Sequence, residues 1–318
     1  MDTKELRKLE QKVDELPLLP QVLVRILQLD SEDNEYFEQF ELLANEDPTL
    51  AVRVIALANS AVSSPVSPVV AIKEALARVG VAAINSLVMS LAVQRVLMPT
   101  TPDQVRLWKH SIYVAVASRA IAKITPALDV EPSQAYVAGL LHDLGRFTML
   151  EHAAPSLLAV DESHWQTPGE LIAADLELYK FTHCELGYLA CKHWGLPDVL
   201  ADVVRNHHQD LGDSAPQDTA AALTRCVQIA DRLSISVLEN DEVEQEDDEA
   251  MSAASATIAE TCVPTVFERQ HCPPALLFGS IPRIQSQARV LLAGLGFASS
   301  RSRSTNVGEQ LRQELPLT

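Results

Sequence analysis

The sequence predicts an all-α protein, and its composition, its helix boundary signals and its lack of strand patterns carry that prediction. The 318 residues include 11 glycines and 5% aromatic residues, which is few for a β-sandwich or barrel. Alanine, leucine and glutamate, which favour helices, are common instead. No run of alternating β-branched residues indicates a strand, apart from short pieces that also fit a helix. Because 47% of the residues are hydrophobic, the helices can bury a substantial core.

In the first hundred residues, proline, aspartate and glycine mark the boundaries of the predicted helices. Asp47 and Pro48 precede the segment TLAVRVIALANSA as an N-cap and a first helical residue. Gly80 is expected to stop one helix just before the next begins. Helices with apolar residues at helical spacing are therefore expected from Pro20, from Pro48, over Val70–Val79 and over Val81–Leu97.

Beyond residue 100, the predicted helices carry histidine and aspartate side chains within them or at their ends. These helices and their polar residues are Asp103–Ile124 with His110, Pro132–His152 with His142 and Asp143, Phe181–Trp194 with His183, Pro197–His208 with His207 and His208, and Thr219–Leu238 with Asp231. Further helices are expected over Gly169–Glu177, Met251–Ala259 and Ser280–Leu292.

The chain is expected to form two packed helical subdomains followed by C-terminal helices. The predicted divisions are an N-terminal helical subdomain 1–99, a second helical subdomain 100–238, an acidic loop 239–250, C-terminal helices 251–298 and a disordered tail 299–318. The acidic stretch 239–249 holds eight acidic residues and no basic one, so we expect a solvated loop. A docking segment for a partner is the alternative interpretation of this stretch.

The net charge of −18 argues against nucleic-acid binding, because 43 acidic residues outnumber 25 basic ones and the chain remains acidic without the acidic stretch. No apolar stretch reaches the length needed to span a bilayer, and the first residues lack the apolar core of a secretory signal. The five cysteines include no CxxC pair and suit reduced thiols. We therefore expect a soluble cytoplasmic protein that does not bind membranes.

The five histidines and two aspartates on the predicted helices suggest a metal centre. Imidazole and carboxylate groups suit a divalent first-row ion such as Mn, Fe, Co, Ni or Zn. Seven ligands exceed the needs of one tetrahedral site but suffice for two ions that share a carboxylate. Asp143 is the natural bridge, because the neighbouring His142 can bind one ion while the carboxylate spans both. For any single histidine, the alternative is a hydrogen-bonded core or surface residue.

Motifs along most of the chain resemble a known family. The segment AYVAGLLHDLGRFTML resembles the His-Asp signature of the HD superfamily of metal-dependent phosphohydrolases. The upstream segments LPLLPQVLVRILQL, NEDPTLAVRVIALANSA and AIKEALARVG resemble the HDOD (HD-related output domain) family. The downstream segment FTHCELGYLACKHWGLPDVLADVVRNHH is similar to that family in its His-x-x-x-Gly, Trp-Gly-Leu-Pro and His-His elements. The resemblance covers about residues 16–209 and implies that the second subdomain is an HD-like bundle.

The resemblance also implies roles for the polar residues. The positions that resemble the ligands of one metal in HD enzymes are His110, His142, Asp143 and Asp231. The positions that resemble the additional ligands of the two-metal HD-GYP enzymes are His183, His207 and His208, with Asp143 shared. The expected cofactor is thus one or two divalent ions, and catalysis, if present, is assigned to Asp143 and Arg146.

Two positions depart from the pattern of the HD enzymes. Arg146 stands where a lysine is common, so it keeps a positive charge for a phosphate but cannot act as an acid. After His208 the chain continues as QDLGDSAP and lacks the Gly-Tyr-Pro signature of cyclic-dinucleotide hydrolases. Hydrolysis of cyclic dinucleotides is therefore not expected.

Two functions follow from these features. The first is a bacterial signal-transduction protein of HDOD type, which retains the metal centre and binds a protein partner through its N-terminal helices. The alternative is an active metal-dependent phosphohydrolase or phosphodiesterase that binds a nucleotide or another phosphoester. The missing Gly-Tyr-Pro element favours the first function, and the complete ligand set favours the second.

Overall fold

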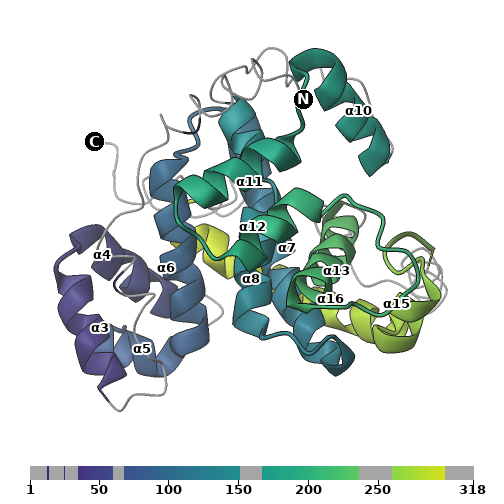
Figure 1. The fold of residues 1–318 in the computed structure, drawn as a ribbon. Helices are drawn as coiled ribbons and strands as arrows, with labels where there is room; N and C mark the ends of the chain where they lie inside the picture. The colour runs from purple at the N-terminus through teal and green to yellow at the C-terminus, as the bar shows by residue number, and fades with distance from the viewer. Residues whose placement is uncertain are drawn as a thin grey trace, which may run out of the picture.

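The computed structural model describes residues 35–59, 68–150, 167–235 and 260–297, together with positions 13 and 25. Within these ranges all the regular elements are helical (Figure 1), which confirms the predicted all-α fold. Several predicted features lie outside the described residues: the helix from Pro20, the acidic loop 239–250, the helix Met251–Ala259 and the tail 299–318.

The first four described helices form the N-terminal part of the structure. They are α3 (Tyr36–Asn45), α4 (Pro48–Ala58), α5 (Ile72–Val79) and α6 (Val81–Val96). Asp47 caps α4 as predicted, because its Oδ1 accepts a hydrogen bond of 3.2 Å from the backbone N–H of Leu50. The same carboxylate pairs with the guanidinium of Arg95 on α6. Gly80 ends α5 with a φ of +85°, which glycine adopts without strain.

Helix α7 (Pro102–Ile124) is the central element of the molecule. It begins with a capping box between Thr101 and Gln104 and packs against α8 (Pro132–Leu141), with the short 3-10 helix η1 (Pro126–Leu128) between them in the chain. Helix α13 (Thr219–Leu233) and helix α16 (Pro274–Gly294) also pack against α7. Most of the middle of α7 is buried, so any polar side chain on that stretch faces the interior.

The prediction of one continuous helix over Pro132–His152 is wrong. Helix α8 ends at Leu141, the chain turns at His142 and Asp143, and helical structure resumes over 144–150. Two residues after Asp143, the backbone makes a close approach at Gly145, where an added Cβ would lie 1.9 Å from the carbonyl oxygen of His183. After the turn, the chain therefore lies directly against the backbone of His183.

Four more helices follow along the described chain before the C-terminal ones. They are α10 (Pro168–Tyr179), α11 (His183–His193), α12 (Asp198–Asn206) and α13 (Thr219–Leu233). Helix α11 packs on α12, and α12 packs on both α8 and α13. A capping box between Thr182 and Glu185 starts α11, and the carboxylate of Asp218 accepts a hydrogen bond from the backbone of Ala221 to start α13. The caps fix where α11 and α13 begin, and the cap of α11 thereby places His183 at its first position.

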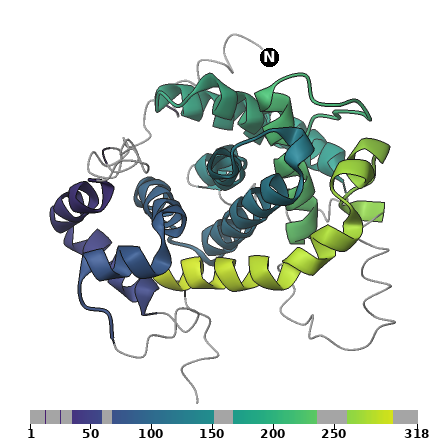
Figure 2. The ribbon, with the colours of Figure 1, turned by 90° about the horizontal axis from the view of Figure 1, so that it is seen from below.

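The C-terminal helices return to the rest of the molecule. Helix α15 (Val266–His271) is followed by α16 (Pro274–Gly294), which packs on α7 and, at its far end, on α4. Figure 2 shows α16 extending along one side of the molecule from α15 to the N-terminal helices. At that end the guanidinium of Arg53 donates a hydrogen bond of 2.8 Å to the carbonyl of Gly294. The buried apolar side chains therefore form one cluster that includes residues from the N-terminal helices, α7 and α16.

Among the described residues, no single helix is both long and apolar enough to cross a membrane. The bent pair formed by α5 and α6 meets that test by length and composition, and its two helices meet at 112°. Most of α6 is buried in the core, as expected of a core helix.

Candidate metal centre

The seven predicted ligand side chains meet in one place inside the structure. They come from separate elements: His110 from α7, His142 and Asp143 from the turn after α8, His183 from the first position of α11, His207 and His208 from the end of α12, and Asp231 from α13. All are buried except His208, which is partly exposed. Whether these side chains bind a metal remains a prediction, but the structure brings every one of them together.

Asp143 lies at the centre of this cluster, and its two oxygens face two different pairs of histidines. Oδ2 is 3.7 Å from Nε2 of His142 and 4.0 Å from Nε2 of His110. Oδ1 is 3.6 Å from Nε2 of His183 and 3.7 Å from Nε2 of His207. This is the arrangement expected of a carboxylate that bridges two ions.

The first half of the cluster is completed by Asp231. Its Oδ1 lies 3.1 Å from Nε2 of His110 and 3.9 Å from Nε2 of His142. The donor atoms of His110, His142 and Asp143 all lie within 4.8 Å of one another. Two imidazoles and two carboxylates thus surround one point, and this donor set suits a first-row divalent ion.

The second half contains three imidazoles and the other oxygen of Asp143. Nε2 of His183 and Nε2 of His207 are 3.3 Å apart, and the ring of His208 lies 4.0 Å from that of His207 between centroids. The donor atoms of these four side chains also lie within 4.8 Å of one another. Within the described part of the chain, the buried Nε2 of His208 has no hydrogen-bond partner, which fits a nitrogen that serves as a metal ligand.

Backbone contacts orient two of the imidazoles. Nδ1 of His142 is 2.8 Å from the carbonyl oxygen of Gly139, and Nδ1 of His207 is 2.8 Å from that of Val204. A carbonyl accepts a hydrogen bond, so Nδ1 of each ring carries a proton and Nε2 is the nitrogen that faces the cluster. This is the tautomer that a metal ligand requires at Nε2.

The surroundings shift the pKa values of the cluster. Burial lowers the pKa of His142 to about 4, although the charges of Asp143 and Asp231 oppose this shift. The pKa of Asp231 is also lowered, because the hydrogen bond and charge of His110 outweigh the effect of its burial. A neutral imidazole and an ionised carboxylate are the forms that bind metal ions, so both pKa shifts favour metal binding in the first half of the cluster.

Arg146 lies against the bridging carboxylate, with its Nη1 3.5 Å from Oδ2 of Asp143. Burial alone raises the pKa of Asp143, but the charges of His142 and Arg146 hold it well below the usual range. The predicted contact between Arg146 and a phosphate stays a prediction.

Two glycines allow the turn after α8 to approach α11. An added Cβ at Gly145 would lie 1.9 Å from the carbonyl oxygen of His183, and one at Gly187 would lie 2.6 Å from a side-chain carbon of Val204. Since no side chain larger than hydrogen fits at these points, the two glycines set the spacing between Asp143 and His183.

Sequence analysis missed one buried carboxylate beside the cluster. Asp175 on α10 is fully buried, and its Oδ2 lies 2.5 Å from Nδ1 of His183 and 3.0 Å from the backbone nitrogen of the same residue. The signal was present in the sequence, because Asp175 shares a helical face with Leu171, four residues earlier and also buried. A charged residue on the apolar face of an amphipathic helix is unusual and indicates a specific partner.

Cys184 also lies beside the cluster. Its Sγ is 3.5 Å from Nε2 of His183 and 3.9 Å from Nδ1 of His207. Burial raises the pKa of this thiol, but the charges of the two histidines lower it to about 6.

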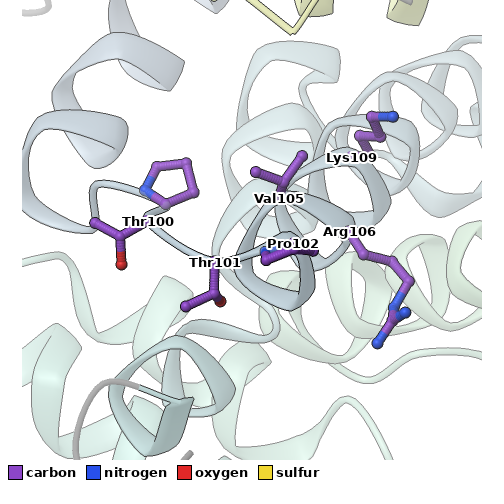
Figure 3. Close-up of a pocket in the computed structure, with 7 residues that line it drawn as sticks. Thr100, Thr101, Pro102, Val105, Arg106 and Lys109 are labelled. Atoms are coloured by element: carbon purple, nitrogen blue, oxygen red, sulfur yellow. The ribbon is translucent and has the colours of Figure 1, made fainter.

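The structure also has an open hollow of about 630 Å³ at the start of α7 (Figure 3). Its lining runs from Pro99 to Lys109 and includes Thr101, which caps α7, and Arg106, which pairs with Asp103. None of the seven predicted ligands lines it. The hollow therefore gives no support to the predicted phosphoester ligand.

Comparison with known proteins agrees with the sequence motifs. The family model of the HDOD domain matches residues 16–210. An uncharacterised protein of Treponema pallidum (strain Nichols) is 26% identical over 208 residues, which are 65% of this chain and 40% of that protein. The chain thus matches about two fifths of this relative's length.

Solved structures share the fold. An HDOD domain protein of unknown function from Geobacter sulfurreducens matches with a TM-score of 0.66 and 25% identity, over 91% of this chain and 97% of its own. A protein from Shewanella amazonensis SB2B, described as a candidate phosphohydrolase, matches with a TM-score of 0.65 and 22% identity, over 91% and 98% of the two chains. At that identity the second match supports the fold alone.

Proposed function

Because the chain belongs to the HDOD family, we propose that it is a bacterial regulatory protein built around a two-ion centre of the HD type. The observation that supports this most is the position of Asp143, whose two oxygens face two separate pairs of histidines. A carboxylate in a purely structural hydrogen-bond pair needs only one such partner.

A regulatory role requires contact between the centre and the rest of the molecule, and α8 supplies it. This helix ends at the turn that holds His142 and Asp143, and it packs against α6 of the N-terminal part. The hydroxyl groups of Tyr136 on α8 and Ser90 on α6 are 2.7 Å apart in the buried interface. A shift in the turn on metal or ligand binding can therefore reach the N-terminal helices, where we propose that a protein partner binds.

We further propose that the protein acts in the cytoplasm. Its five cysteines are all free and buried, which fits a reducing compartment.

The second candidate function is hydrolysis of a phosphoester such as a nucleotide, and Arg146 is the observation that favours it. Divalent ions at such a centre lower the pKa of a water molecule and neutralise charge on a phosphoryl group. Asp143 lies between the two halves of the centre. The guanidinium of Arg146 lies beside Asp143 and offers planar N–H donors for a phosphate oxygen.

One experiment separates the two functions. The protein is purified without chelator, its bound metal is measured, and its activity is assayed on a generic phosphodiester and a panel of nucleotides. Bound metal without turnover supports the regulatory protein, whereas turnover that is lost in an Asp143→Ala variant supports the hydrolase. A protein that binds no metal, even after loading with Mn, Fe or Zn, contradicts both.

A further inference from the structure

A buried carboxylate outside the predicted ligand set contacts one of the predicted ligands. Asp175 on α10 has no solvent exposure, whereas Glu177, two residues further along the same helix, is exposed. Burying a carboxylate is costly unless it gains strong partners. The partners of Asp175 therefore indicate why the helix carries it.

Within the described residues, the hydrogen-bond contacts found for Asp175 are both with His183. Its Oδ2 accepts a hydrogen bond of 3.0 Å from the backbone N–H of His183 and lies 2.5 Å from the Nδ1 of that imidazole. Since an ionised carboxylate only accepts hydrogen bonds, the Nδ1 atom carries a proton. Nε2, on the opposite side of the ring, then faces Oδ1 of Asp143 at 3.6 Å and Nε2 of His207 at 3.3 Å.

The partner of His183 differs from those of two other predicted ligands. Nδ1 of His142 and Nδ1 of His207 lie against the neutral carbonyls of Gly139 and Val204. A carboxylate partner makes an imidazole a stronger metal ligand than a carbonyl partner does, because the negative charge raises its basicity. The second half of the cluster thus contains one imidazole with a carboxylate partner, whereas the imidazoles of His142 and His207 have carbonyl partners.

We propose that Asp175 is the positioning residue of the second half of the centre. It holds His183 with Nδ1 protonated and directs Nε2 towards an ion shared with Asp143, His207 and His208. The proposal rests on the two-ion centre proposed above. It extends that centre to α10, a helix that supplies none of the seven predicted ligands.

Metal titration of an Asp175→Asn variant tests the proposal, because asparagine keeps the size of the side chain and removes its charge. We expect affinity for one of the two ions to fall 10- to 100-fold and affinity for the other to remain. The matched control is Glu177→Gln, which removes an exposed carboxylate from the same helix and should leave both affinities unchanged. Circular dichroism establishes that both variants are folded.

A second readout is the proton on Nδ1 of His183. In ¹⁵N-labelled wild-type protein, NMR should detect a downfield proton on Nδ1 of His183, and Asp175→Asn should move that signal upfield. Absence of a proton on Nδ1 in the wild type overturns the proposal.

The outcomes distinguish this proposal from the proposed centre. Wild-type protein that binds no metal refutes the centre and the proposal together. Wild-type protein that binds two ions, with both affinities unchanged in Asp175→Asn, refutes the role of Asp175 alone.

Discussion

At the scale of single residues, the centre depends on which atom of each side chain faces the cluster. The oxygens of Asp143 face opposite halves, and carbonyl contacts turn Nε2 of His142 and His207 inward. These orientations follow from local backbone contacts, because each Nδ1 meets a carbonyl three residues earlier in its own helix. The sequence indicated which residues take part but could not show these orientations.

Substitution of Asp231 should prevent metal binding in the half of the centre that contains His110 and His142, and it should leave metal binding in the other half unchanged. Its carboxylate contacts His110 and His142. In the second half, its charge acts on His208, and no hydrogen bond or ion pair to His183 or His207 is seen among the described residues. An Asp231→Asn variant should therefore bind one ion per chain where the wild type binds two, as measured by elemental analysis after gel filtration. Loss of both ions, or of neither, would contradict the division into two halves.

The metal-free protein should lose stability in mild acid because of His142. An exposed imidazole has a pKa of 6.5, whereas burial lowers that of His142 to about 4. Between these values the unfolded chain binds a proton that the folded protein does not, so stability falls as the pH drops from 6.5 to 4. The expected loss from this residue is about 3 kcal/mol.

Urea denaturation at pH 7 and at pH 4, in the presence of a chelator, measures this loss. A His142→Gln variant cannot titrate at this position and should lose about 3 kcal/mol less over the same interval. Equal losses in the two proteins would show that His142 is protonated in the folded state.

At the scale of elements, the centre depends on where helices end. The sequence predicted a start of α7 at Asp103, next to the observed start at Pro102, where Thr101 and Gln104 form a capping box. It failed at the turn of His142 and Asp143, because apolar residues at helical spacing continue across the break from Leu140 and Leu141 to Leu144. Directly after the turn, Gly145 packs against α11, which is a tertiary contact.

Substitution of Gly145 should therefore disturb the second half of the centre. A Gly145→Ala variant places a methyl group against the backbone of His183, so α11 must move away. We expect a loss of about 1–3 kcal/mol in the free energy of unfolding, measured by denaturation, and weaker binding of one ion.

The control is Gly279→Ala in α16, where an added Cβ meets no atom within 4 Å. This change should stabilise the protein slightly, by about 0.5–1 kcal/mol, because alanine has a higher helix propensity than glycine. Equal effects of the two substitutions would show that the close approach at Gly145 is unimportant.

At the scale of the whole molecule, α16 joins the N-terminal helices to the centre. It packs on α7 and α4, and its buried residues belong to the one hydrophobic cluster that includes both regions. The sequence predicted two helical subdomains and the residues of the cluster. It could not show that residues as far apart as His110 and Asp231 meet, because that depends on the packing of α13 against α7.

The continuous core predicts that the two regions unfold together. Calorimetry should record a single transition with equal calorimetric and van 't Hoff enthalpies. An Ile284→Ala variant, which empties a buried position of α16, should lower the temperature of that transition and reduce stability by about 2–5 kcal/mol. Two separate transitions, with only one affected by the variant, would show that the regions fold independently.

The bridging position of Asp143 is tested most directly by anomalous diffraction from crystals of the zinc-loaded protein. The structure predicts two anomalous peaks about 3.5–4 Å apart, one beside Oδ2 of Asp143 near His110 and the other beside Oδ1 near His183. A map with no peak in the cluster, or with a single peak that contacts only one of these oxygens, would contradict the two-ion centre.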